Sequence, residues 1–173
     1  MIYTPAEDSY LLAECVQKYT GRSALEIGVG SGIVLDALGR RFDQVIGTDI
    51  DIEALRLCRK KSAALLVCCD AASALSQGAR FDLAVSNPPY LPDDEEFADP
   101  TVHGGPAGIE STVRFVESAL PLVAPGGRIL VIVSSLADQT ALERLIADCR
   151  LKKRIVKEKR LFYETLSAIE LFR

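Results

Sequence analysis

The sequence predicts an α/β fold in which a mostly parallel sheet is covered on both faces by helices. Strand-sized apolar segments alternate with helical segments along most of the 173 residues. In addition, three successive strand candidates carry an acid at or near their C-terminal ends, namely Glu26, Asp49 and Asp70. The carboxyl ends of parallel strands meet at one edge of a sheet, where open α/β sheets bind their ligands. The pattern therefore predicts both a fold class and a ligand site.

The individual elements follow in order, without an internal repeat, a linker or a low-complexity tract. We expect helices at 7–19, 31–40, 51–62, 110–122 and 138–149, and a short helix near 71–77. We expect strands at 23–28, 44–49, 64–69, 81–86, 128–134, 151–158 and 161–172, the last two forming a hairpin. The long polar segment 91–106 is expected to be a loop, and a loop of this length in a compact domain is usually functional or mobile.

The most informative segment is Ser86-Asn87-Pro88-Pro89-Tyr90, which follows the apolar run 81–85. Each proline fixes its own backbone and restricts the residue before it, so Asn87 should lie in a stiff turn at the end of a strand. A carboxamide beside a free carbonyl can hold an NH2 group, since both oxygens accept hydrogen bonds. The alternative is a proline-stiffened loop in which the asparagine only caps the chain.

A glycine-rich turn, Gly28-Val29-Gly30-Ser31-Gly32, separates a short apolar strand from a helix. Glycines let a ligand approach the backbone, and a helix N-terminus is electropositive. The spacing differs from the G-x-G-x-x-G of dinucleotide sites. Glu26, two residues before the first glycine, suits a cationic ligand. A plain tight turn is the alternative.

The acids that end the next two strands extend this site. Asp49 lies 21 positions after Gly28, where an acid can accept hydrogen bonds from ribose hydroxyls. Asp70 can accept a hydrogen bond from an adenine amino group. Either acid could instead cap the following helix. Three such acids in succession favour a nucleoside-containing cofactor.

Together these residues resemble a class I S-adenosylmethionine-dependent methyltransferase, and the resemblance covers nearly the whole chain. Asn-Pro-Pro-Tyr is shared by members that methylate a planar nitrogen. The segments 3–12, 104–108 and 164–167 are similar to the HemK-like release-factor glutamine methyltransferases of the archaeal and eukaryotic branch. The resemblance implies a Rossmann-like seven-stranded sheet in the order 3-2-1-4-5-7-6, with the last strand antiparallel. It also implies a single methyltransferase domain over residues 1–173.

The resemblance implies a site in two parts and no metal. The catalytic residues expected are Asn87, Pro88, Pro89 and Tyr90. The S-adenosylmethionine-binding residues expected are Ser9, Glu26, Gly28, Gly30, Gly32, Asp49, Ile50, Asp70, Ala71 and Asn87. Asn87 and the Pro88 carbonyl would hold both N–H groups of a substrate amide, which is catalysis by positioning. Tyr90 would pack against the flat substrate group.

Charge favours a protein substrate over a nucleic acid. The net charge is −4 and the pI about 5.1, whereas nucleic-acid binding depends on neutralising phosphates. The acidic positions 93–96 and Asp99 would attract a basic protein. The basic stretch 152–160 is interpreted as a solvated hairpin.

The resemblance implies methylation of the glutamine amide in the Gly-Gly-Gln motif of a class I translation release factor, and this is the function we expect. The alternatives are methylation of a nucleobase amino group, or of another protein side chain such as a histone lysine. A binding subunit without activity, or a dinucleotide-dependent enzyme, is a further alternative. The intact Asn-Pro-Pro-Tyr motif counts against that last class.

Cysteine usage and hydropathy bear on metal binding and location. Cys58, Cys68 and Cys69 fit no standard metal site and are expected to be small core residues. No signal peptide or membrane-spanning segment is expected, so we expect a cytoplasmic protein, with a nuclear pool open if the source is eukaryotic.

Strand 64–69 is expected at the edge of the sheet and contains no charge and no proline. Exposed edges are normally blunted by such residues, so this strand should either be covered by a loop or pair with another chain. The resemblance implies a small zinc-binding activator protein at this edge, and hence a heterodimer.

Overall fold

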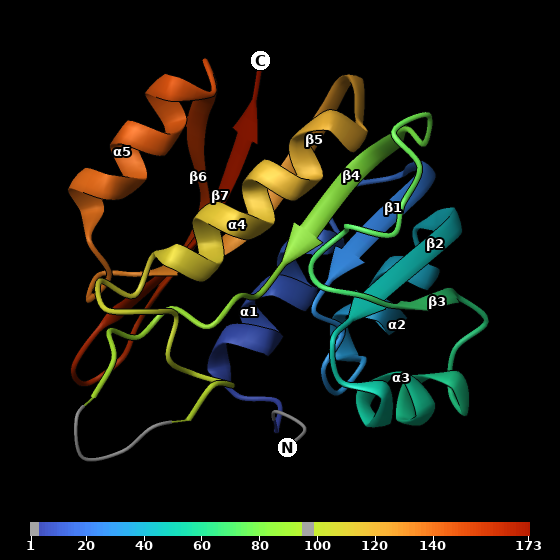
Figure 1. Ribbon diagram of the computed structural model, residues 1–173, viewed down its shortest axis with the longest axis horizontal. Helices are drawn as coiled ribbons and strands as arrows, with labels where there is room; N and C mark the ends of the chain where they lie inside the picture. Colours follow the sequence, from blue (N-terminus) through green and yellow to red (C-terminus); the bar gives the residue numbers. More distant parts are fainter. Residues whose placement is uncertain (1–3, 95–98) are drawn as a thin grey trace.

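The computed structural model describes residues 4–94 and 99–173, which form one sheet with helices on both faces (Figure 1). The helices are α1 Glu7–Val16, α2 Ile33–Gly39, α3 Ile52–Arg59, α4 Glu110–Ala119, the 3-10 turn η1 Leu120–Leu122 and α5 Gln139–Asp148. The strands are β1 Gly21–Ile27, β2 Phe42–Asp49, β3 Leu65–Cys68, β4 Phe81–Ser86, β5 Val123–Ser134, β6 Lys152–Arg160 and β7 Thr165–Phe172. Tyr3, Glu95 and Glu96, which the sequence analysis singled out, lie outside the described residues.

The strand order is β3-β2-β1-β4-β5-β7-β6, as expected. Strand β7 is antiparallel to both of its neighbours, whereas the pairs among β1 to β5 are parallel. The chain leaves β1 toward β2 and β3 on one side and later builds β4 and β5 on the other. The direction in which the chain adds strands to the sheet therefore reverses between β1 and β4. Open α/β sheets bind ligands at such a switch point.

Two apolar layers fill the space between the sheet and its helices. Helices α1, α2 and α3 pack on one face and α4 and α5 on the other. Successive residues of β1 contribute to opposite layers, with Ala24 in the first and Leu25 in the second, and both are fully buried. Burial on both faces explains why the strands are apolar runs rather than alternating patterns.

Three sequence expectations about elements are corrected. Residues 71–77 form turns and not a helix, because Ala71 adopts a left-handed φ of 47° and a segment this short gains little from helix formation. Residues 161–164, which were expected in the last strand, instead form the turn between β6 and β7. In this turn the Leu161 N–H donates a hydrogen bond to the Glu164 carbonyl at 2.8 Å. Cys68 is exposed and not a core residue, because β3 is an edge strand.

The edge position of β3 is confirmed. Its one partner in the sheet is β2. Leu65 at the start of β3 is 63% exposed, and Ile50 and Ile52, which follow β2, are 73% and 45% exposed. No helix within residues 4–94 and 99–173 is long and apolar enough to cross a membrane.

Candidate active site

The glycine turn and the Asn-Pro-Pro-Tyr segment leave the sheet side by side at the switch point. Ile27, the last residue of β1, lies opposite Ser86, the last residue of β4. The Ser86 hydroxyl donates to the Ile27 carbonyl at 2.9 Å. Two motifs that are sixty residues apart in the sequence thus form adjacent walls of one site.

The glycine turn is held against β2 and over α3. Its three glycines have left-handed φ angles of 78°, 47° and 85°, which other residues rarely adopt. The Gly28 N–H donates to the Thr48 carbonyl at 2.8 Å, and the Gly30 N–H donates to Asp49 Oδ2 at 2.9 Å. A Cβ at Gly32 would lie 2.8 Å from the Cys58 sulfur, so this position has no room for a side chain.

The Asn-Pro-Pro-Tyr segment is supported from behind by the end of the long loop. The N–H groups of Tyr90 and Leu91 both donate to the Val102 carbonyl, at 3.1 and 3.0 Å. A Cβ at Gly104 would lie 2.3 Å from the Pro89 carbonyl oxygen, and one at Gly108 would lie 2.6 Å from the Tyr90 carbonyl oxygen. The glycine-rich stretch 104–108 is therefore needed so that two backbone segments can pack against each other.

The first turn of α1 supplies the third wall. Asp8 and Ser9 are 2% and 4% exposed. The Tyr90 hydroxyl donates to Asp8 Oδ2 at 3.1 Å, and the Ser9 N–H donates to Asp8 Oδ1 at 2.5 Å. Asp8 therefore connects helix α1 to the Asn-Pro-Pro-Tyr segment, a role that the sequence analysis did not assign to it.

These walls enclose a pocket with about 570 Å³ of empty space open to solvent. Eight of the expected site residues line it: Ser9, Glu26, Gly28, Gly30, Asn87, Pro88, Pro89 and Tyr90. The other lining residues are Asp8, Val29, Ser31, Ile33, Val34, Leu91, Thr101 and Val102. Thr101 and Val102 come from the loop, and no motif in the sequence marks them.

Two of the pocket's polar side chains each have a buried oxygen atom without a partner. Among residues 4–94 and 99–173, Glu26 Oε2 and Asn87 Oδ1 have no hydrogen-bond partner, and Glu26 is 3% exposed. Burial, together with the nearby charge of Asp49, raises the pKa of Glu26 well above that of an exposed glutamate. Buried polar atoms are nearly always paired, so these two are expected to bind a ligand in the pocket.

Five expected cofactor residues do not line this pocket: Gly32, Asp49, Ile50, Asp70 and Ala71. Asp49 uses its two carboxylate oxygens to accept from the N–H groups of Gly30 and Asp51, at 2.9 and 2.8 Å. Asp70 forms an ion pair with Arg114 at 3.3 Å. Both acids still lie at the carboxyl ends of β2 and β3, along the same edge of the sheet as the pocket.

The pocket provides hydrogen-bonding groups and shape. The described lining residues include no histidine, lysine or cysteine. Within residues 4–94 and 99–173 there is no group of three or more His, Cys, Asp or Glu side chains that could hold a metal ion. The described lining thus offers carboxylate, amide and backbone groups that can hold and orient a planar polar group beside a cationic one.

Comparison with protein families identifies the chain. The model of the methyltransferase small domain matches residues 7–162. The chain belongs to the methyltransferase small domain family. The confirmed strand order is the Rossmann-like methyltransferase arrangement, and the chain is accordingly a methyltransferase.

Individual members of this family extend the comparison. A protein of Methanocaldococcus jannaschii, provisionally named an N5-glutamine methyltransferase, is 28% identical over 99% of this chain and 92% of its own length. A release factor glutamine methyltransferase of Koribacter versatilis is 29% identical over 79% of this chain and 57% of its own length. The chain thus spans little more than half the length of that bacterial relative.

A solved structure supports the same family assignment. A chain of the E. cuniculi Mtq2–Trm112 complex, responsible for methylation of the eRF1 translation termination factor, superposes with a TM-score of 0.78. It is 27% identical, and the match covers 98% of this chain and 97% of that chain. The resemblance to HemK-like release-factor glutamine methyltransferases is confirmed.

Proposed function

We propose that this methyltransferase uses S-adenosylmethionine to methylate the glutamine side-chain amide in the Gly-Gly-Gln motif of a class I translation release factor. The observation that carries the proposal is the position of Asn87 beside the glycine turn, with its buried Oδ1 unpartnered. An amide NH2 from the substrate is the group that this oxygen and a neighbouring backbone carbonyl can hold together. The M. jannaschii and E. cuniculi relatives support the choice of substrate.

The cofactor fits the residues that line the pocket. Glycines 28 and 30 allow close approach to the backbone, and Glu26 is a buried acid that can compensate a cationic group. Ser9, in the first turn of α1, would cover one side of the bound cofactor. Asp49 and Asp70 would receive the ribose and adenine further along the edge, with Asp70 also held by Arg114. When bound, the cofactor supplies an electrophilic methyl group on a sulfonium.

The protein's own contribution is to orient a weak nucleophile. The lone pair of an amide nitrogen is delocalised, so reaction requires that the nitrogen point at the methyl group. Asn87 and the Pro88 carbonyl would hold both N–H groups, and the stiff proline turn would keep these two acceptors fixed. Tyr90, anchored through its hydroxyl to Asp8, would provide the flat surface for the amide. Positioning of this kind accelerates reactions by several orders of magnitude.

A substrate panel tests the proposal against nucleobase methylation. Labelled S-adenosylmethionine is incubated with the chain and, separately, with a release factor, a histone, tRNA and DNA. We expect label in the release factor alone, because Asp93, Asp94 and Asp99 lie near the site and repel phosphates. Label in tRNA or DNA, with none in the release factor, would contradict the proposed substrate.

Asp49→Ala is expected to lower cofactor affinity about ten- to a hundredfold, because charge-assisted hydrogen bonds to ribose hydroxyls would be lost. Titration calorimetry measures the affinity directly. Asp43→Ala is a matched control, since Asp43 lies on the same strand at its opposite end and is exposed. Equal affinities of the two variants would exclude a cofactor role for Asp49.

We further propose that an activator protein, small and zinc-binding, docks on the exposed edge strand β3. Exposed apolar side chains lie at both ends of this edge, Leu65 at the start of β3 and Ile50 and Ile52 after the end of β2, next to unpaired backbone groups of the strand. Main-chain pairing at such an edge, with pockets for the apolar side chains, is a known form of recognition. The E. cuniculi neighbour was solved as a complex with Trm112, which supports a partner for this chain.

Leu65→Lys is expected to abolish binding of the activator, because it places a charge on the apolar edge strand. Leu66 is less suitable for the test, since it is partly buried and packs against the core. Ile155→Lys is the control, as Ile155 is 53% exposed on β6 at the opposite edge of the sheet. Each variant is co-expressed with the activator, and size-exclusion chromatography shows whether the two proteins elute as a complex. A fully active monomer that ignores the activator would refute the docking site.

A further inference from the structure

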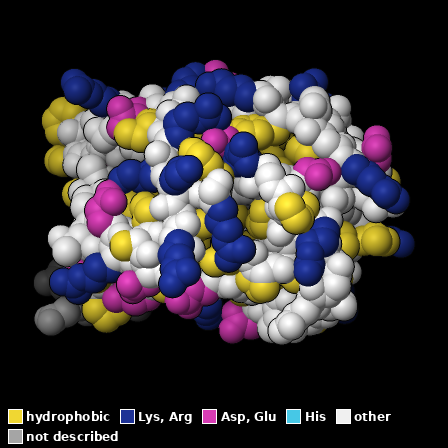
Figure 2. All heavy atoms as spheres, turned by 90° about the horizontal axis from the view of Figure 1, so that it is seen from above, with side chains coloured by type: hydrophobic (Ala, Val, Ile, Leu, Met, Phe, Trp, Pro, Cys, Tyr) yellow, Lys and Arg dark blue, Asp and Glu magenta, His cyan; other side chains and the backbone are white. Residues whose placement is uncertain are grey.

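Basic residues gather at the edge of the sheet opposite the active site. Parallel strands begin there and β7 ends there, so the residues that enter or leave these strands share one face. They are Arg22 in β1, Arg41 before β2, Arg80 before β4, Arg150 and Lys152 at the start of β6, and Arg173 after β7. Figure 2 shows this face, with Lys and Arg side chains spread across it among fewer Asp and Glu side chains. We call these six residues the basic edge.

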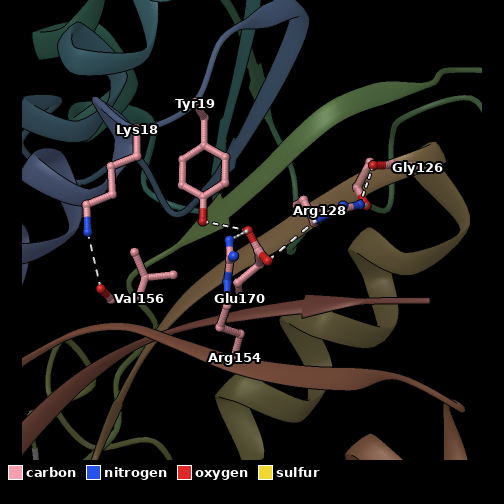
Figure 3. Close-up of polar contacts among 8 residues, drawn as sticks. Lys18, Tyr19, Gly126, Arg128, Arg154, Val156 and Glu170 are labelled. Carbon is pink, nitrogen blue, oxygen red and sulfur yellow. Dashed lines mark hydrogen bonds and ion pairs between the residues drawn. The ribbon is translucent and has the colours of Figure 1, made fainter.

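Two arginines share one buried carboxylate beside this face, which leaves one positive charge in excess (Figure 3). Glu170 is 2% exposed and is shared by two arginines, Arg154 at 3.0 Å and Arg128 at 3.7 Å. The Tyr19 hydroxyl donates to the same carboxylate at 2.7 Å. One carboxylate thus faces two guanidinium groups, and the Arg154 side chain is 65% exposed. The surface beside the basic edge therefore keeps a net positive charge.

Acids also lie at this end of the sheet, such as Asp43 in β2 and Asp148 at the end of α5, but among the described residues they leave half of the basic edge without an ion pair. Arg22, Lys152 and Arg173 are exposed, and none forms an ion pair within the described part of the chain. Asp82, which lies close by, instead accepts from the backbone N–H groups of Arg22 and Ser23, at 2.7 and 3.0 Å. Part of the positive charge of this face is therefore not neutralised by ion pairs, although the chain as a whole has a net charge of −4.

We propose that the basic edge binds the phosphate backbone of an RNA, at a surface separate from the methyl-transfer pocket. The row crosses the strands from β2 to β6, which at normal strand spacing is about 24 Å. A row of this length suits a run of phosphates and not a single small anion. Five of the six residues are arginines, whose planar guanidinium groups match phosphate oxygens in pairs. Backbone contacts of this kind give affinity without sequence specificity.

This site differs from a nucleic-acid substrate site, which the acidic surface near the pocket disfavours. An RNA held at the basic edge would leave the pocket open to a protein substrate at the other end of the molecule. RNA binding at the basic edge is expected whichever substrate the enzyme methylates.

The test uses a fluorescent RNA stem-loop and a triple variant, Arg22→Glu with Lys152→Glu and Arg173→Glu. The control triple variant, Arg56→Glu with Arg144→Glu and Arg160→Glu, changes the net charge by the same amount away from the basic edge. Fluorescence anisotropy gives affinities at several salt concentrations. The wild type is expected to bind with an affinity that falls linearly with salt on logarithmic axes. The basic-edge variant is expected to lose roughly tenfold or more in RNA affinity. The slope of its log affinity against log salt concentration should be smaller in magnitude by about 3.

Three further results complete the test. The control variant is expected to bind RNA nearly as well as the wild type, and both variants should methylate the release factor normally. Equal losses in the two triple variants would show that overall charge, and not the basic edge, governs binding, and would overturn the proposal. So would an absence of RNA binding by the wild type. Tighter binding of a polyglutamate chain than of RNA would assign the surface to an acidic protein instead.

Discussion

Asn87→Ala is expected to abolish methylation of the release-factor glutamine, with a loss of about a thousandfold or more, because the substrate amide would no longer be oriented. The fold should be unaffected, since Asn87 Oδ1 has no partner in the described part of the chain and its removal breaks no hydrogen bond of that atom there. Cofactor affinity should fall only modestly. Mass spectrometry of the glutamine peptide measures the reaction, and thermal unfolding measures the fold.

A conservative variant of the same segment serves as the control. Tyr90→Phe keeps the aromatic ring and loses only the hydroxyl that donates to Asp8. We expect this variant to retain much of the activity. Methylation by Asn87→Ala at a level close to that of Tyr90→Phe would exclude the amide clamp as the main source of catalysis.

Glu26→Gln is expected to weaken cofactor binding about ten- to a hundredfold and to stabilise the cofactor-free protein at high pH. The first effect follows from loss of the buried carboxylate that compensates the cationic ligand. The second follows from the raised pKa of Glu26. In the unfolded chain this carboxyl ionises at ordinary acidic pH, whereas the folded protein keeps it protonated to a higher pH.

The pH dependence has a defined sign. The stability that the protonated Glu26 contributes is fully present below the unfolded pKa, and it is lost as the pH rises through the higher folded pKa. Wild type and Glu26→Gln should therefore have similar free energies of unfolding in acid, and the variant should be more stable above that folded pKa. Cofactor affinity of the wild type should rise over the same pH range, and that of the variant should not.

Denaturant unfolding and titration calorimetry at several pH values measure these effects. Glu53→Gln is a suitable control, because Glu53 lies on the exposed side of α3 and forms an ion pair with Arg56. A Glu26→Gln protein that binds the cofactor as tightly as the wild type at every pH would remove Glu26 from the site.

Most of the fold could be predicted because local patterns and tertiary structure agree. The strand order and the position of the edge strand were correct, and β4 begins and ends at the expected residues 81 and 86. The failures occur where tertiary contacts decide. The left-handed Ala71 prevents a helix after β3, and the exposure of Cys68 follows from its edge position and not from its type.

The site was predictable where a motif occupies consecutive residues. The glycine turn and the Asn-Pro-Pro-Tyr segment were placed correctly in one pocket, because both follow strands that end at the switch point. Thr101 and Val102 were not predicted, since their place in the wall depends on backbone bonds from Tyr90 and Leu91 to the Val102 carbonyl. Such loop contacts leave no periodic pattern in the sequence.

The central claim is that the Gly-Gly-Gln glutamine of a release factor receives the methyl group at its side-chain nitrogen. The most direct test is fragment-ion mass spectrometry of the release factor after incubation with the chain, S-adenosylmethionine and the activator. We predict one added methyl group on that glutamine, and none when it is replaced by alanine. A methyl group on any other residue, or a release factor that stays unmodified while an RNA in the same mixture is methylated, would contradict the account.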